Sequence, residues 1–115
     1  MRLASGREIS AKHILIAVGA WPVMPEIDGA EHCITSNEVF HLPELPRRIV
    51  IQGAGYIALE FAGVFNALGS QVTVVNRSDK ILRGYDHDLT DRLLPIMQGR
   101  GIEFAFNHPI ERVTR

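Results

Sequence analysis

The chain has 115 residues, 46% of them hydrophobic, which fits one domain with a modest core and argues against a second full domain. Twelve Lys and Arg against thirteen Asp and Glu give a formal net charge of -1, so no global basic field attracts nucleic acid or an acidic membrane. The single cysteine, Cys33, excludes an internal disulfide, a dithiol redox centre and a cysteine-rich zinc site. We interpret Cys33 as a small hydrophobe or an ordinary loop thiol, and we expect no metal.

The apolar runs are short. The longest, ILIAV, is far below the roughly 20 residues that a membrane helix needs. The opening stretch, MRLASGREIS, lacks the apolar segment of a secretory signal. We therefore expect no membrane association and a reducing, cytoplasmic setting.

The first 45 residues predict short strands without partners, followed by a connector. RLASGREIS alternates weakly around Ser5 and predicts two short strands and a turn, whereas residues 13–19, HILIAVG, predict a buried strand stopped by glycine. Prolines and a glycine within residues 22–29 predict an extended connector. Ser36 is expected to cap a short helix over NEVFHL, which has an acid near its first turn.

Strands and helices alternate after the prolines of PELP, so we place a domain over residues 46–115. Pro95 lies inside the second helix pattern and is expected to kink that helix or to mark its real start. This order predicts an α/β fold, a βαβαβ unit whose parallel strands are joined by right-handed crossovers. The expected elements are a strand at 48–52, a helix at 56–68 closed by Gly69, a strand at 71–76, a helix at 88–100 ended by Gly101, and a strand at 102–106.

Gly53, Gly55 and Ala58 form the pattern G-x-G-x-x-A between the first strand and the first helix of this unit. The spacing is typical of a Rossmann-like nucleotide-binding unit. There the first glycine permits a tight turn, the second lets a pyrophosphate approach the backbone, and the third small residue keeps the helix close to the sheet. The expected ligand is an anion, held by free N–H groups and the helix dipole. The alternative is that the glycines serve only the turn.

The end of the second predicted strand selects the dinucleotide. An NAD-binding unit commonly has Asp or Glu there, about 20 residues beyond the glycines, for the ribose hydroxyls. Here Asn76 stands 23 residues after Gly53, with Arg77 beside it and Arg83 six residues further on. A neutral amide and two guanidiniums suit a 2′-phosphate, which favours NADP(H) over NAD(H). The alternative is two solvated surface arginines.

Two more side chains near the glycines have open interpretations. Glu60, in the second turn of the helix, is either solvated or held against a cation from another domain. Tyr56, between the glycine turn and the helix, either packs at the helix end or covers a ligand.

Taken together, these motifs resemble a known family. Residues 53–86, GAGYIALEFAGVFNALGSQVTVVNRSDKILRGYD, closely resemble the NADPH-binding segment of the flavin-dependent pyridine nucleotide-disulfide oxidoreductases, and among them the glutathione reductase type. ILIAVGAWPVMPEIDG and ITSNEVFHLPELP resemble the stretches that lead from the flavin domain into that segment. The similarity covers nearly the whole chain and is most specific in G-A-G-Y-I-A-x-E and in the arginine spacing.

The resemblance implies roles for individual residues. The glycines match the family's pyrophosphate turn, and the two arginines match the pair that holds the 2′-phosphate. Tyr56 matches an aromatic residue that covers the nicotinamide pocket, and Glu60 matches an acid that pairs with a lysine of the flavin domain. Ala17, Val18 and Gly19 sit where the family has an A-T-G turn against FAD, although valine replaces the hydroxyl residue. The expected cofactor-binding residues are Gly53, Gly55, Tyr56, Ile57, Ala58, Glu60, Asn76, Arg77, Arg83 and Gly19.

The departures from the family are as informative as the matches. The sequence has no amino-terminal FAD fingerprint, no C-x-x-x-x-C disulfide and no carboxy-terminal segment with the family's catalytic His-Glu pair. Family chains are several times longer. We therefore expect a middle piece of a longer protein, with no catalytic residue of its own and no activity by itself. In this piece residues 1–45 are expected to be the tail of an FAD-binding domain and a connector, and residues 46–115 an NADP(H)-binding domain truncated before its own end.

The resemblance implies that the parent enzyme passes electrons from NADPH to FAD, to a dithiol and then to glutathione disulfide, as a homodimer. The same segment could instead belong to a reductase for trypanothione, glutathione amide or dihydrolipoamide. The dihydrolipoamide type fits less well because Asn76 and the arginines replace the acid expected for NAD. A stand-alone nucleotide-binding module is the remaining alternative, against which the strands expected in residues 1–19 argue.

Overall fold

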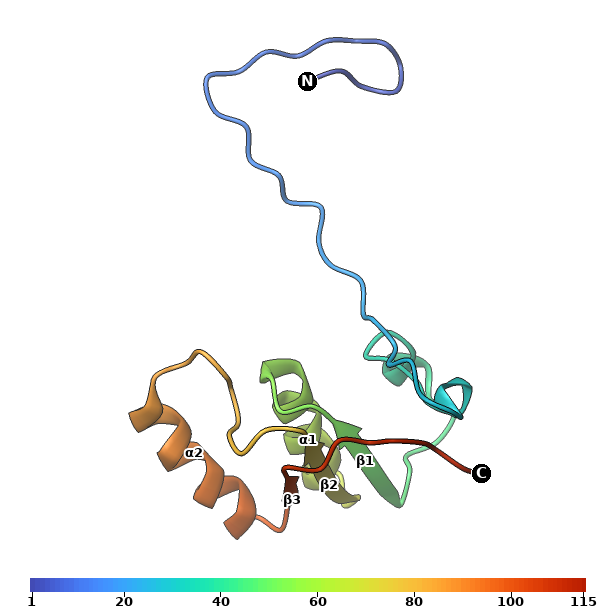
Figure 1. Cartoon of the computed structure of the whole chain (residues 1–115), viewed down its shortest axis with the longest axis vertical. Helices are drawn as coiled ribbons and strands as arrows, with labels where there is room; N and C mark the ends of the chain where they lie inside the picture. The colour runs from blue at the N-terminus through green and yellow to red at the C-terminus, as the bar shows by residue number, and fades with distance from the viewer.

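Three apolar segments form one parallel sheet, seen in a computed structural model that describes residues 1–115 (Figure 1). The strands are β1 (Arg48–Gln52), β2 (Gln71–Asn76) and β3 (Glu103–Phe106), in the spatial order β1-β2-β3. Both pairs are parallel, and parallel neighbours need a crossover. The helices α1 (Tyr56–Ala67) and α2 (His87–Gly99) provide these crossovers. The predicted α/β fold with its βαβαβ order is confirmed.

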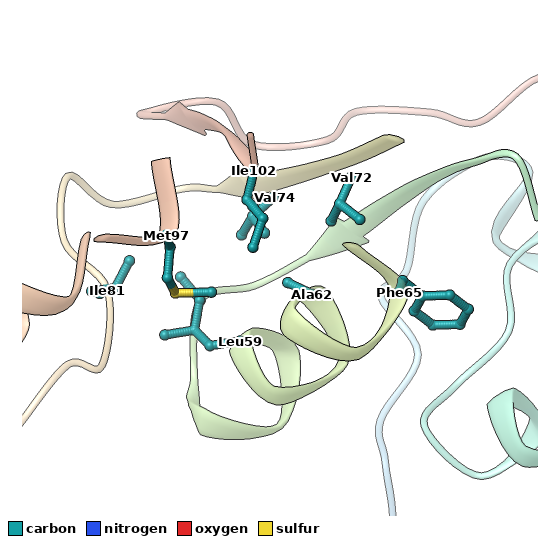
Figure 2. Close-up of a cluster of buried hydrophobic side chains, with 9 residues drawn as sticks. Leu59, Ala62, Phe65, Val72, Val74, Ile81, Met97 and Ile102 are labelled. Carbon is teal, nitrogen blue, oxygen red and sulfur yellow. The ribbon is translucent and has the colours of Figure 1, made fainter. Parts of the chain in front are cut away.

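The hydrophobic core lies on one face of the sheet. Side chains alternate between the two faces of a strand, and on one face of β2 the side chains of Val72 and Val74 are fully buried. The buried residues of α1 that cover this face, Leu59, Ala62 and Phe65, recur at the spacing of one helix face. Figure 2 shows side chains from α1, β2 and α2 gathered in this cluster. Its buried members are Ala54, Leu59, Ala62, Phe65, Val72, Val74, Ile81, Met97 and Ile102.

The opposite face of the sheet carries polar and exposed residues. Val50 of β1 pairs with Thr73 of β2, which pairs with Glu103 of β3, so the three side chains share this face. Val50 is 63% exposed, and the Thr73 hydroxyl donates a hydrogen bond to the Glu103 carboxylate at 3.1 Å. The unit therefore has two layers, the sheet and the helices on its one apolar face.

The second helix runs through its proline. The Asp86 carboxylate caps α2 by accepting a hydrogen bond from the Asp88 amide at 2.8 Å, so Pro95 does not mark the helix start. Proline removes one hydrogen bond to the carbonyl four residues earlier, at Asp91. Both residues are exposed, so water can satisfy that carbonyl and the helix tolerates the loss.

Neither α1 nor α2 has the length and apolar character that a membrane crossing needs.

The amino-terminal residues do not form the predicted strands. Around Ser5 there is a turn with one antiparallel bridge, between Arg2 and Glu8, in place of two strands. Residues 10–24, here called the arm, make no backbone–backbone hydrogen bond, and Leu15 is 89% exposed. Figure 1 shows the arm extending away from the sheet. Both strand predictions are wrong, because an apolar run becomes a strand only beside a partner, and this fold places none there.

Thr35 is hydrogen-bonded to the first residue of the short helix before β1, the 3₁₀ segment η2 (Glu38–His41), whose N-cap residue is Asn37. The Thr35 amide and hydroxyl donate to the Glu38 carboxylate at 2.7 and 2.5 Å, and the Asn37 amide donates to the Thr35 hydroxyl at 3.2 Å. These hydrogen bonds from Thr35 lower the pKa of Glu38. The predicted cap, Ser36, is wrong, because η2 begins after Asn37 and has no side-chain cap. The hydroxyl residue that pairs with the acid is Thr35, three positions before Glu38, which is the spacing of a capping box.

The segment before the sheet unit pairs with the segment that follows β3. Asp28 and Arg112 form a parallel bridge, in which the Val113 amide donates to the Asp28 carbonyl at 2.8 Å. Gly29 follows, with φ 80°, and leads into the 3₁₀ segment η1 (Ala30–His32). A Cβ at Gly29 would collide with the Val113 carbonyl oxygen, so this contact requires glycine.

The two glycines between β1 and α1 have different conformations. Gly53 has φ 100°, which an L side chain rarely adopts, so the turn after β1 needs glycine there. Gly55 has φ -77° and ψ 175°, which any residue adopts, and no heavy atom lies within 4 Å of the position of a Cβ. The fold therefore requires glycine at the first position and not at the second.

We predict that Gly53→Ala and Gly55→Ala differ in stability. Gly53→Ala should lower the free energy of unfolding by about 1–2 kcal/mol, the cost of a left-handed conformation. Gly55→Ala should stay within about 0.5 kcal/mol of the parent, because reduced freedom in the unfolded chain offsets a poorer N-cap. Urea unfolding of both variants measures the difference. Equal losses would contradict the conformations described here.

Candidate functional site

Three segments converge at the carboxyl edge of the sheet. The Gly53 amide donates to the Val75 carbonyl at 2.8 Å, which joins the glycine turn to the end of β2. The Leu82 amide donates to the Ala54 carbonyl at 2.8 Å, which joins the turn to the loop between β2 and α2. In open α/β sheets, ligands bind outside the carboxyl ends of the strands. The sequence-predicted residues at positions 53–58, 76, 77 and 83 all lie on these connected segments.

The start of α1 offers unpaired amides next to Gly55. The first amides of a helix, here those of Tyr56 and Ile57, have no partner within the helix, and no side chain caps α1. Gly55 is exposed, and Ala58 is half-buried where the helix begins to pack. An anion approaching Gly55 would meet free N–H groups, the positive end of the α1 dipole and no side chain.

Both predicted arginines lie in the loop that follows β2. Arg77 and Arg83 are exposed, and no carboxylate lies within 4 Å of either guanidinium, since the one such contact of the chain joins His32 to Glu31 at 3.8 Å. A cavity of about 160 Å³ lies between this loop and the start of α2. Arg83 lines the cavity and Arg77 does not. The loop therefore offers two guanidiniums that no carboxylate of the chain neutralises.

Asn76, the last residue of β2, is turned toward the loop. Its side-chain amide donates to the Ser78 hydroxyl at 2.8 Å and to the Lys80 carbonyl at 2.9 Å, and lies 3.3 Å from the Ser78 carbonyl. The backbone carbonyl of Asn76 accepts a hydrogen bond from the His108 backbone amide at 3.1 Å. Asn76 is thus at the predicted position, with its amide hydrogens engaged by the protein.

The remaining predicted side chains of α1 face solvent. Tyr56 is 56% exposed and Ile57 is 43% exposed, so neither is fixed by packing at the helix end. Glu60 is exposed and has no cationic partner in the chain. The sequence left two interpretations of Tyr56 open, packing at the helix end or covering a ligand. The exposed side chain does not fit the first.

The structure does not bring Gly19 to the other predicted residues. Gly19 lies in the arm, exposed, with φ 76° and no heavy atom within 4 Å of the position of a Cβ. Ala17 and Val18 beside it are exposed as well, and Figure 1 shows the arm directed away from the sheet.

Sequence reasoning missed part of the cavity wall. Lys80, His87 and the acidic Asp79 line the cavity together with Arg83. Thr90 lines it from α2, where its hydroxyl donates to the His87 carbonyl at 3.1 Å. Lys80, a basic residue three positions after Arg77, could have been predicted from the sequence as part of this wall. The Leu82–Ala54 hydrogen bond had no sequence signal, because a backbone contact is independent of side-chain type.

Comparison with known proteins shows which family this chain is similar to. The family model of pyridine nucleotide-disulphide oxidoreductases matches residues 2–115. The chain is 51% identical over 96 residues to glutathione reductase of Nostoc sp., covering 84% of this chain and 21% of that protein. It is 47% identical over 102 residues to trypanothione reductase of Trypanosoma congolense, covering 86% of this chain and 21% of that protein.

A solved structure is similar as well. The Cu(II) complex of the HOCl-induced flavoprotein disulfide reductase RclA from Escherichia coli matches with a TM-score of 0.78 and 33% identity, covering 84% of this chain and 23% of that chain. The chain spans 20 to 25% of the length of the curated relatives it matches. The sheet, the glycine turn and the match over residues 2–115 agree, and the chain belongs to the pyridine nucleotide-disulphide oxidoreductase family.

Proposed function

We propose that this chain is the NADPH-binding segment of a flavoprotein disulfide reductase. The observation that carries the proposal is Gly55. Neither its backbone angles nor its neighbouring atoms require glycine, so the missing side chain serves something that approaches from outside the chain. Free amides of α1 border the same space, which suits the pyrophosphate of a dinucleotide.

The loop after β2 supports NADPH over NADH. Arg77 and Arg83 have no carboxylate partner, and a guanidinium can bind the oxygens of a 2′-phosphate through paired hydrogen bonds. The end of β2 carries the neutral Asn76 in place of the acid that a ribose 2′-hydroxyl would prefer. The bound nucleotide would supply a hydride, while the chain's own residues bind and orient it.

For the whole protein we propose NADPH-dependent reduction of glutathione disulfide through FAD and a dithiol, by a cytoplasmic homodimer. Glutathione reductases of Nostoc sp., Burkholderia cepacia and Pisum sativum, at 46 to 51% identity, support this substrate. In this reading Tyr56 covers the nicotinamide end and Glu60 meets a cation outside the chain. Their exposure and lack of partners are compatible with both roles.

Trypanothione disulfide is the second candidate substrate. The trypanothione reductases of Trypanosoma congolense and Leishmania donovani are 47% and 40% identical to the chain, which overlaps the range of the glutathione reductases. Turnover of the full-length protein with each disulfide distinguishes the two candidates, and a clear preference for trypanothione disulfide would replace the first proposal.

We predict that Gly55→Val abolishes binding of both NADPH and NADH while the chain remains folded. The side chain would fill the space opposite the first amides of α1, where the pyrophosphate is expected. Calorimetric titration with each nucleotide measures the loss, and circular dichroism verifies the fold. Retained affinity in a folded Gly55→Val chain would remove the glycine turn from the site.

We predict that Arg77→Glu weakens NADPH binding far more than NADH binding. The change removes a charge-assisted hydrogen bond worth about 1.5–3 kcal/mol and places a negative charge beside the 2′-phosphate. Arg92→Glu, at an exposed position of α2, is the matched control and should leave both affinities unchanged. Equal losses for the two nucleotides would exclude Arg77 from the phosphate site.

We predict that this chain alone neither retains FAD nor reduces a disulfide. Ala17, Val18 and Gly19 offer FAD only an unpaired segment of the arm, and the exposed Cys33 is a single thiol. Disulfide reduction by NADPH needs a flavin between hydride and sulfur. Flavin absorbance of the purified chain and NADPH oxidation with glutathione disulfide and added FAD test this. Yellow protein with sustained turnover would refute it.

A further inference from the structure

We infer that Asn76 is a positioning residue that fixes the loop carrying Arg77 and Arg83, and that it does not itself bind the phosphate of the nucleotide. The inference rests on the proposed function, because it concerns the loop that presents the two arginines. It assigns Asn76 a different task from that of the acid which ends β2 in an NAD-binding unit.

The contacts of the Asn76 side chain all lie within its own loop. Asn76 shares a sheet face with the buried Val72 and Val74, because residues two apart in a strand point the same way. On that side its Nδ2 donates to the Ser78 hydroxyl at 2.8 Å and to the Lys80 carbonyl at 2.9 Å. The amide therefore ties the first and the middle parts of the loop to the end of β2.

This arrangement uses up both amide hydrogens of Asn76. A phosphate oxygen accepts hydrogen bonds and needs a donor, and the carboxamide has only the two hydrogens of Nδ2. The remaining polar atom, Oδ1, is an acceptor, which would repel a phosphate. Asn76 can therefore bind the 2′-phosphate only by releasing Ser78 and Lys80, which would undo the loop.

The loop needs such anchors because part of it is strained. Leu82 has φ 49°, a left-handed conformation that persists only where the surroundings fix it. Two neighbouring contacts do so, the buried side chain of Ile81 and the Leu82 amide bound to the Ala54 carbonyl. In the sequence, Lys80, whose carbonyl is bound by Asn76, comes directly before Ile81, and Arg83 comes directly after Leu82. Asn76 is thus the third anchor of a segment that ends in Arg83.

The variant Asn76→Asp tests the inference with almost no change in side-chain size. It replaces Nδ2 by a carboxylate oxygen that faces the Lys80 carbonyl, so a hydrogen bond becomes a repulsion. In the nucleotide-free chain, hydrogen exchange of the Leu82 amide should become about tenfold faster. Amides in the middle of α1 should keep their rates. This measurement requires no nucleotide and is independent of the proposed function.

Nucleotide titration separates positioning from direct contact. If Asn76 positions the loop, Asn76→Asp should weaken NADPH binding about tenfold and should not tighten NADH binding, because a new acid cannot help while its loop is displaced. If Asn76 instead contacts the ribose directly, the new carboxylate should tighten NADH binding. Tighter NADH binding would overturn the inference.

Asn66→Asp is the matched control. The Asn66 amide also donates to a backbone carbonyl, that of Arg100 at 3.1 Å, in another part of the fold. Asn66→Asp should leave Leu82 exchange and the NADPH-to-NADH affinity ratio unchanged. If Asn66→Asp changed the Leu82 exchange rate and the affinity ratio as much as Asn76→Asp does, the effects would reflect a general loss of stability. That result would overturn the inference.

Ser78→Ala provides a second test should Asn76→Asp fail to fold. It removes one acceptor of the Asn76 amide and leaves the other, so Leu82 exchange should accelerate by a smaller factor. The positioning role would be overturned if the Leu82 amide exchanged at the parent rate in Ser78→Ala and, provided that Asn76→Asp folds, in that variant as well. A parent chain that binds neither nucleotide would refute the proposed function, while the exchange measurements would still decide the role of Asn76 in the loop.

Discussion

Parallel pairing of β1 with β2 is the constraint on which the rest of the structure depends. Parallel strands bring their carboxyl ends to one edge, and the bond from the Gly53 amide to the Val75 carbonyl extends the pairing one step beyond β1. The glycine turn is thereby fixed beside Asn76. Burial of Val72 and Val74 under α1 holds the register, because a slip of one residue would turn both toward the solvent.

The sequence predicted the sheet unit closely because its local signals and its packing agree. Val and Ile favour strands, glycines follow both helices, and the apolar spacing of α1 matches the face it buries. The helices therefore begin and end within a residue of prediction. Where the two disagree, packing decides. The run HILIAVG has strong strand character, yet it stays extended and exposed because no strand lies beside it.

For the candidate site, residue positions were predictable and residue contacts were not. The G-x-G-x-x-A spacing places Gly53 and Gly55 correctly, but only the backbone angles separate a glycine that the turn needs from one that it does not. Asn76 was correctly placed at the end of β2. Its bonds to Ser78 and Lys80 depend on the path of the loop, which follows from Ile81 entering the core and Leu82 adopting a left-handed conformation.

The backbone pairing of Asp28 with Arg112 and Val113 joins the segment before the sheet unit to the segment after β3. Paired backbones lie about 5 Å apart, so residues 28 and 113 are neighbours in space although the whole sheet unit lies between them in the sequence. A side chain at Gly29 would push these two segments apart, so one residue far from the glycine turn and the arginine loop decides whether the segments on either side of the sheet unit can pair.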